Sequence, residues 1–296
     1  MYKLGQFRRQ VLKFEPITVT HPTQSPVLPL VCDSPHSGTT YPDDFGYEVP
    51  FELLRRGEDT DVDALWAQVP AVGGTLISAN FPRTYIDPNR AVDDIDPALL
   101  DGQWAGPLTP SEKSRLGYGL IWQKMDADNL IYSKKLAVSH VLHRIQNYWR
   151  PYRDALDQVF KQSREQFGGV WHLNLHSMPN NAFERLGFGK NRVLADFVLG
   201  DRDGTTCEPG FIAVVEQSLL KRGYTVARND PYKGVAVLAD LGRPDLNQHS
   251  LQIEVRRPLY MNEETRERSE NFKVLQAHLA AATAEIAEYV KARASL

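Results

Sequence analysis

The chain has few cysteines and no long apolar run, and both absences exclude classes of protein. Its 296 residues contain 2 cysteines, Cys32 and Cys207, which are too few for a disulfide framework. No apolar stretch approaches the ~20 residues that a membrane-spanning helix needs. The opening segment, MYKLGQFRRQVLKFEP, lacks the apolar core and the small-residue cleavage site of a secretory signal. We therefore expect a cytoplasmic protein that does not bind membranes.

An excess of charge of one sign is also missing. The 34 Lys and Arg residues nearly balance the 37 Asp and Glu residues, which gives a net charge of −3. Because both signs are interspersed, the sequence does not predict binding to nucleic acid. No repeat and no Gly-, Ser- or Pro-rich linker divides residues 1–296, which we expect to form a single domain. No pattern indicates the oligomeric state.

Short apolar runs alternate with amphipathic stretches along the chain. Runs typical of buried strands occur at residues 28–34, 75–79, 171–176, 224–228 and 251–255. Helical patterns occur at residues 50–69, 111–167, 208–223 and 263–294, with Pro151 as a kink or a new helix start. This alternation predicts an α/β sandwich with a largely parallel or mixed sheet. In such sheets ligands bind beyond the carboxyl ends of the strands.

Two histidines stand where strand-like runs end. His36 lies in SPHSG, directly after the run at 28–34. In WHLNLH the apolar residues alternate with His172, Asn174 and His176, so these three share one face of an extended chain. A catalytic zinc uses three protein ligands and keeps one position for water. His36 and His176, with acids nearby, are candidates for such a site, although a single histidine is more often structural.

A carboxylate interrupts the apolar run at 251–255. Glu254 lies between Ile253 and Val255, and a lone buried charge usually has a partner or a function. Metal ions lower the pKa of a bound water to ~7, and a nearby carboxylate can then take its proton. Glu254 suits this role as a base.

An acidic stretch, GEDTDVDALW, precedes a helical pattern. Asp59 is placed to cap the helix with its carboxylate, and Asp61 and Asp63 then fall in the first turn. The helix dipole favours negative charge at that end. This structural explanation accounts for all three acids without a metal.

Two arginines and an Asn lie close together in FPRTYIDPNR. Arg83, Asp87, Asn89 and Arg90 fall within eight residues around a Pro turn. Arginines in one loop can bind carboxylates through paired N–H groups. A turn held by an internal Asp–Arg pair explains the segment equally well.

A serine hydrolase is the weaker alternative. The chain contains no G-x-S-x-G motif, which places the nucleophile of many such enzymes. Ser37 and Ser177 each follow a histidine directly, but no feature singles out one serine as a nucleophile.

The motifs together resemble those of one family. SPHSG, DTDVDALW, PRTYIDPNR, LHSMP and LQIEVRRPLYM occur in this order between residues 34 and 261, and in this the chain resembles the N-formylglutamate amidohydrolases. The resemblance implies a fold similar to the zinc carboxypeptidases, a three-layer α/β/α sandwich around a mixed, largely parallel sheet. It also implies metal-dependent hydrolysis of N-formyl-L-glutamate to formate and L-glutamate, a step of histidine degradation.

The same resemblance implies a ligand set for one divalent metal. His36, His176 and an acid of the DTD stretch would bind it, with Asp61 favoured over Asp59 as the acid. Zinc suits these ligands, and so do cobalt and manganese. Glu254 matches the glutamate that acts as general base.

Residues for the substrate follow from the resemblance as well. Arg83, Asn89 and Arg90 match positions that bind the substrate, and Arg256 is a further candidate for its carboxylates. One departure is the loop YKGVAVLADLG, which lacks the Arg-His pair of other members. It leaves open another N-acyl amino acid as the substrate, cleaved by a deacylase or carboxypeptidase-like enzyme. A non-catalytic protein that binds amino acids is the remaining alternative.

Overall fold

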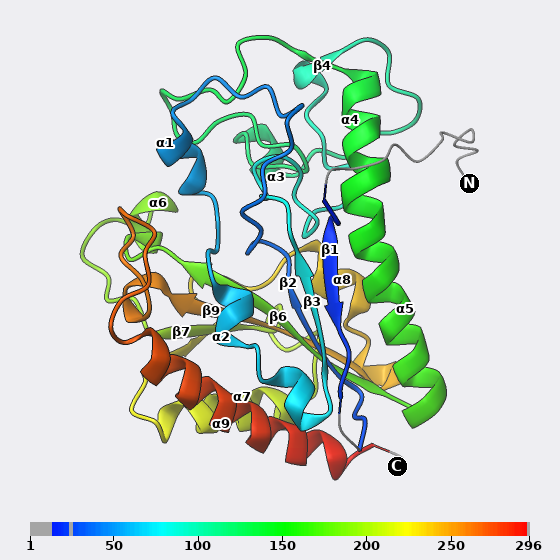
Figure 1. Cartoon of the computed structure of the whole chain (residues 1–296), viewed down its shortest axis with the longest axis vertical. Coiled ribbons are helices and arrows are strands. Elements are labelled where there is room, and N and C mark those ends of the chain that lie inside the picture. The colour runs from blue at the N-terminus through cyan, green and yellow to red at the C-terminus, as the bar shows by residue number, and fades with distance from the viewer. Residues whose placement is uncertain (1–13, 24–25, 295–296) are drawn as a thin grey trace.

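A seven-stranded sheet in the order β1-β3-β2-β6-β9-β7-β8 forms the centre of the structure, a computed structural model that describes residues 14–23 and 26–294 (Figure 1). Its strands are β1 (Ile17–Thr20), β2 (Leu30–Ser34), β3 (Thr75–Ala79), β6 (Val170–Met178), β7 (Phe197–Gly200), β8 (Val226–Arg228) and β9 (Gln248–Arg256). Strands β3, β2, β6 and β9 are parallel to one another, whereas β1 and β7 run antiparallel to β3 and β9. The prediction of a mixed, largely parallel sheet is confirmed.

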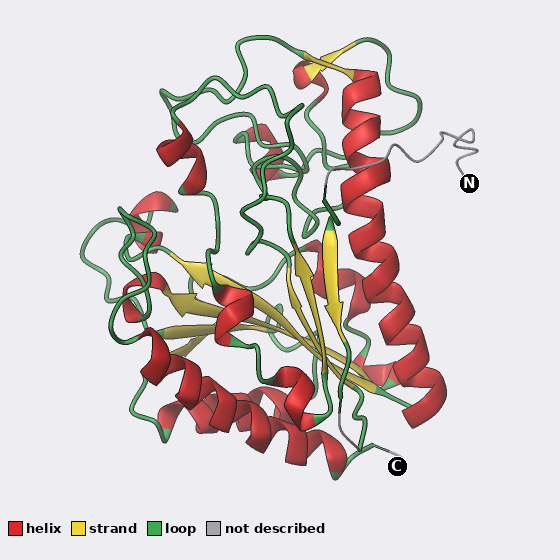
Figure 2. Ribbon diagram, in the orientation of Figure 1, coloured by secondary structure: helices red, strands yellow, loops and turns green. Residues whose placement is uncertain are grey.

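Helices cover both faces of this sheet, as the layers in Figure 2 show. On one face lie α5 (Arg150–Phe167) and α8 (Ala236–Leu241), whose buried side chains join those of β2 and β3 in one apolar cluster. On the other face lie α2 (Val62–Leu65), α7 (Pro209–Leu220) and α9 (Phe272–Lys291). The predicted three-layer sandwich is therefore confirmed. That residues 1–296 form a single domain stays a prediction.

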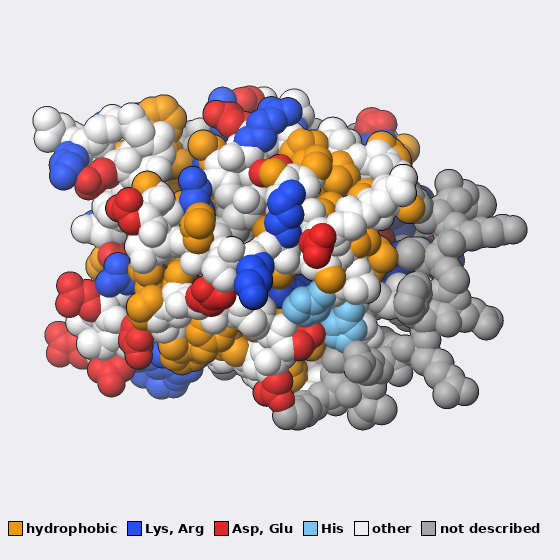
Figure 3. Space-filling model, turned by 90° about the horizontal axis from the view of Figure 1, so that it is seen from above, with side chains coloured by type: hydrophobic (Ala, Val, Ile, Leu, Met, Phe, Trp, Pro, Cys, Tyr) orange, Lys and Arg blue, Asp and Glu red, His pale blue; other side chains and the backbone are white. Residues whose placement is uncertain are grey.

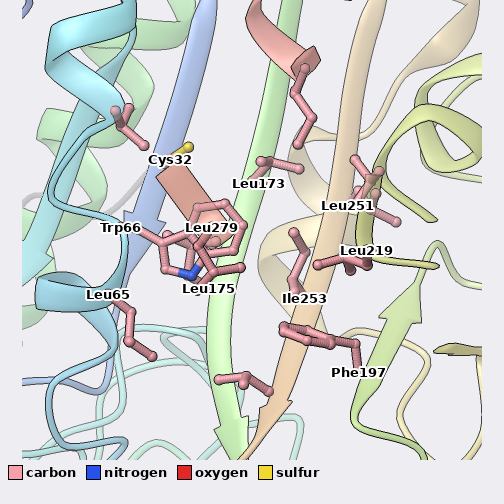
Figure 4. Close-up of a cluster of buried hydrophobic side chains, with 14 of the residues drawn as sticks. Cys32, Leu65, Trp66, Leu173, Leu175, Phe197, Leu219, Leu251, Ile253 and Leu279 are labelled. Carbon is pink, nitrogen blue, oxygen red and sulfur yellow. The ribbon is translucent and has the colours of Figure 1, made fainter. Parts of the chain in front are cut away.

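The central strands are apolar on one face and polar on the other, although both faces are buried. Leu173 and Leu175 of β6 pack with Leu251 and Ile253 of β9 beneath α7 and α9 (Figure 4). The alternate residues are polar and face the layer of α5 and α8; they are Asp33, His172, Asn174, Ser250, Gln252 and Glu254. The predicted alternation along β6 is confirmed.

The helix predicted over residues 50–69 is interrupted. The structure has α1 (Phe51–Arg55), a turn, α2 and a short 3-10 turn η1 (Val69–Val72). Asp61 has a φ of 64°, in the left-handed region, directly before α2 begins. Glu58 and Asp59 are buried within the turn, so their hydrogen bonds, and not a continuous helix, decide the local conformation.

The long helical prediction over residues 111–167 is confirmed only in part. After α3 (Glu112–Arg115) the chain is irregular until β5 (Leu136–Ala137), which pairs with β4 (Leu100–Asp101). The chain then forms one long continuous helical segment, seen in Figure 1, which consists of α4 (Val138–Arg144), a π-helical turn η3 (Ile145–Trp149) and α5. Pro151 lies in the first turn of α5, directly after the π-helical turn, so the helical run changes its hydrogen-bond pattern just before the proline. The remaining short elements are η2 (Pro97–Leu99), α6 (Ala182–Arg185), η4 (Pro244–Leu246) and η5 (Arg257–Leu259).

Long loops lie at the carboxyl ends of the parallel strands and are held together by close packing and hydrogen bonds. A Cβ on Gly38 would lie 2.3 Å from the carbonyl oxygen of Phe81, so only glycine permits this close approach. The buried guanidinium of Arg144 donates to the carbonyl oxygens of Tyr85 at 2.8 Å and Phe45 at 3.0 Å. These contacts hold the loops after β2 and β3 in fixed positions.

The surface at this end carries charges of both signs. Figure 3 shows Lys and Arg side chains across the middle of the face, with Asp and Glu between and around them. Among the described residues, no helix is both long and apolar enough to span a membrane. The opening segment that we searched for a signal lies mostly outside the described residues.

Candidate metal centre and substrate site

The parallel strands bring the predicted residues to one edge of the sheet. His36 follows β2, and His176 and Glu254 lie near the ends of β6 and β9. The register pairs His176 directly with Glu254 across these two strands. The loop after β3 adds Arg83 and Asn89, so segments that are far apart in sequence meet here.

Three buried side chains at this edge could hold a metal ion. One ligand atom each from His36, Asp59 and His176 lies within 4.8 Å of the others, the one such group found within the described part of the chain. The Oδ2 atom of Asp59 lies 3.2 Å from Nδ1 of both imidazoles. Two imidazole nitrogens and a carboxylate are a donor set that zinc and related ions favour.

The structure brings Asp59, the alternative acid, to the two histidines, and not the favoured Asp61. Asp61, which we favoured, is bound to the Arg268 guanidinium at 2.6 and 2.9 Å and does not face the histidines. Asp59, the alternative, is held in place because its N–H donates to the carbonyl oxygen of His36 at 2.9 Å. The helix-capping role expected for Asp59 is also wrong, since α2 begins at Val62 and the Asp59 carboxylate faces the imidazoles.

Hydrogen bonds on the far side of each ring orient the two histidines. Nε2 of His36 lies 2.7 Å from a carboxylate oxygen of Asp87. Nε2 of His176 lies 2.7 Å from the amide oxygen of Asn174. Because these oxygens accept a proton from Nε2, the lone pair of each ring is on Nδ1, which faces Asp59. The residues therefore fit a metal at this position.

The charges of these three side chains also favour the binding of a cation. Burial lowers the pKa of His176, which favours the neutral form that binds metals. Burial alone would raise the pKa of Asp59, but its contacts with His176 and His36 and the charge of Arg257 hold it well below its ordinary value. The group thus offers a negative carboxylate between two imidazole nitrogens.

The second arginine of the pair Arg256-Arg257 is the one that contacts this group. Arg257 is buried and donates to Oδ1 of Asp59 at 2.9 Å, which leaves Oδ2 for the histidines. Arg256, our candidate, instead pairs with Asp196 at 2.6 Å. No sequence pattern indicated Arg257, because β9 ends at Arg256 and strand alternation does not describe the turn that follows.

Arg83, Asn89 and Arg90 lie beside the candidate metal group, through contacts with Asp87 and His176. Arg83 donates to Oδ2 of Asp87 at 2.8 Å, and Nε of Arg90 lies 3.9 Å from the same oxygen. The Nε atoms of both arginines are buried without a hydrogen-bond partner, and so is Oδ1 of Asn89. Buried unpaired donors beside a single carboxylate are suited to receive an anion.

Glu254 is buried beside the same group. Its Oε1 atom accepts a hydrogen bond from Gln252 at 3.0 Å. Burial and the nearby charge of Asp59 raise the pKa of Glu254 well above its ordinary value. A carboxylate in this environment takes up a proton readily.

A tyrosine that the sequence analysis missed also faces this region. Tyr232 lies in the loop that lacks the Arg-His pair, and burial and the charge of Glu254 raise the pKa of its hydroxyl. Its ring packs against the cluster of Met178, Phe183 and Val198. No sequence motif marked this residue, because only the fold brings the loop beside β9.

Comparison with known proteins decides the family. The sequence model of the N-formylglutamate amidohydrolase family matches residues 28–261. The chain belongs to this family. A crystal structure of the N-formylglutamate amidohydrolase from Ralstonia eutropha JMP134 is 61% identical, with a TM-score of 0.93 over 94% of this chain and 99% of that one. The family predicted from the sequence motifs is confirmed.

More distant proteins are similar in sequence or in fold. The N-formylglutamate deformylase of Pseudomonas putida is 27% identical over 241 residues, which is 80% of this chain and 83% of that protein. A gene product of Agrobacterium tumefaciens, 17% identical with a TM-score of 0.65 over 94% of each chain, shares the fold.

The two acids give a direct test of the ligand set. Asp59→Asn removes the negative charge between the histidines and should weaken zinc binding strongly. Loss of a residue that only hydrogen-bonds to a metal ligand weakens binding about 10- to 100-fold, and loss of the ligand itself should weaken it further. Asp61→Asn, the matched control two residues away, should bind zinc like the wild type. Competition with a chromophoric chelator measures both affinities, and the reverse order of effects would contradict the assignment to Asp59.

Proposed function

We propose that this protein hydrolyses the formamide bond of N-formyl-L-glutamate and releases formate and L-glutamate. The observation that supports this most is the buried group of His36, Asp59 and His176 with Glu254 on the adjacent strand, in a chain of this family. Zinc is the proposed metal, and the cytoplasm is the proposed location.

The metal ligands and their partners have defined tasks in this proposal. His36, Asp59 and His176 hold the ion, and Arg257 keeps the Asp59 carboxylate in position through its second oxygen. When bound, such an ion polarises a carbonyl oxygen and lets water act as a nucleophile near neutral pH.

Glu254 moves the proton that the reaction requires. It takes a proton from the attacking water as the oxygen bonds to the formyl carbon, and it delivers that proton to the nitrogen as the C–N bond breaks. The raised pKa of Glu254 favours the first transfer, because a weaker acid is a stronger base. Burial keeps bulk water from competing for the proton.

Arg83, Asn89 and Arg90 orient the substrate. N-formyl-L-glutamate carries two carboxylates, and the unpaired Nε–H groups of the two arginines can bind carboxylate oxygens. The Asn89 amide lies 3.0 Å from Nε2 of His176, which places it at the border between the metal ligands and the arginines. A substrate held by these groups has its formyl end directed toward His176.

Formate release from a small panel of substrates tests the proposed function. Wild-type protein should hydrolyse N-formyl-L-glutamate, lose activity with a chelator and regain it with zinc. N-formyl-L-glutamine lacks one charge, and a lost charge-assisted hydrogen bond costs about 1.5–3 kcal/mol, so kcat/KM should fall about 10- to 150-fold. Chelator-resistant activity, or a preference for the glutamine compound, would contradict the proposal.

Glu254→Gln tests the base. The amide keeps the size of the side chain but cannot take up the proton, so kcat should fall by about 10²–10⁴-fold while zinc remains bound. Glu216→Gln is the matched control, since Glu216 of α7 pairs with Arg228 of β8 and lies outside the site. A Glu254→Gln variant with wild-type kcat would rule out the proposed role.

A further inference from the structure

The hydrogen bond behind His176 continues into the sheet as a chain of buried polar groups. Asn174 accepts at Oδ1 from His176, and its Nδ2 donates to Oδ1 of Asp33 at 2.8 Å. The same Asp33 oxygen lies 2.7 Å from Nε2 of His172. Nδ1 of His172 in turn lies 2.7 Å from the hydroxyl of Ser250.

Strand register builds this chain. Asp33 of β2 pairs with Asn174 of β6, and His172 of β6 pairs with Ser250 of β9. The four side chains are 0% exposed, so no solvent competes for their hydrogen bonds. Tyr152 of α5 closes the end of the chain, because its hydroxyl donates to the second oxygen of Asp33 at 2.6 Å.

The charge of Asp33 fixes the direction of the hydrogen bonds that lead from it to His176. Burial alone would raise the pKa of Asp33, but hydrogen bonds from His172, Tyr152 and Asn174 lower it. An ionised carboxylate only accepts, so Asn174 must direct its NH₂ group to Asp33 and its oxygen to His176. The His176 proton is then on Nε2 and its lone pair on Nδ1.

We propose that Asp33 and Asn174 are positioning residues that set the tautomer and ring orientation of His176 for the metal. The inference rests on the metal site of the proposed function. Each histidine ligand then has a carboxylate behind it, Asp87 directly for His36 and Asp33 through the Asn174 amide for His176. Carboxylates in this position raise the basicity of the ligand and fix its geometry.

This arrangement also explains how Asn89 is free for substrate. The Nδ2 atom of Asn89 lies 3.0 Å from Nε2 of His176, which directs its proton to Asn174 and so does not accept from this amide; the Asn89 oxygen has no partner. Because Asn174 already accepts the Nε2 proton, Asn89 is not needed to hold the imidazole. Its amide can turn toward a bound substrate without releasing the metal ligand.

Zinc affinity, measured by competition with a chromophoric chelator, tests the positioning pair. Asp33→Asn should weaken zinc binding by about 10- to 100-fold, although Asp33 contacts none of the three metal ligands. Asn174→Leu, which is similar in size, should do the same. Ser250→Ala is the matched control, because it breaks the same buried chain at its far end and should leave the affinity unchanged.

Thermal unfolding of the metal-free variants separates ligand positioning from general stability. The inference is supported if Asp33→Asn and Asn174→Leu both reduce the zinc affinity and Ser250→Ala does not, whatever the melting temperatures of the variants. Wild-type affinity in a folded Asp33→Asn variant overturns it, and if that variant does not fold, wild-type affinity in Asn174→Leu does so. A wild-type protein that binds no zinc overturns the metal site and the inference together.

Discussion

The parallel register of β2, β6 and β9 is the constraint on which the site depends. It sets Asp33 beside Asn174 and His176 beside Glu254, so the polar residues of three strands form a continuous buried layer. A shift of one residue would turn each of these side chains to the opposite face of its strand. The apolar residues under α7 and α9 prevent that shift, because they would then be moved out of their cluster.

The buried carboxylates of Asp33, Asp59 and Asp87 each have a cation or a hydrogen-bond donor as a specific partner. Arg257 neutralises Asp59, Arg83 neutralises Asp87, and His172 donates to Asp33. Burying the three carboxylates is tolerated because each of them accepts hydrogen bonds within the protein. Glu254 is different, since no cation lies within ion-pair distance of it among the described residues. The group that moves the proton is therefore the one left without a fixed counter-charge.

Local sequence patterns predicted the sheet better than the loops. The strand β3 was predicted to the residue, and alternation placed His176 and Glu254 correctly, because strand geometry has a fixed period. The choice between Asp59 and Asp61 depends instead on a φ of 64° and on Arg268, 207 residues further along the chain. A contact between residues so far apart in sequence leaves no signal in a local pattern. A single sequence without relatives offers only local patterns.

Zinc-edge anomalous diffraction from crystals grown with zinc tests the central claim most directly. The account predicts one anomalous peak between Nδ1 of His36, Nδ1 of His176 and the carboxylate of Asp59, with Glu254 beside it. A peak on Asp61, coordination through Nε2 of either histidine, or no peak between the two imidazoles would contradict it.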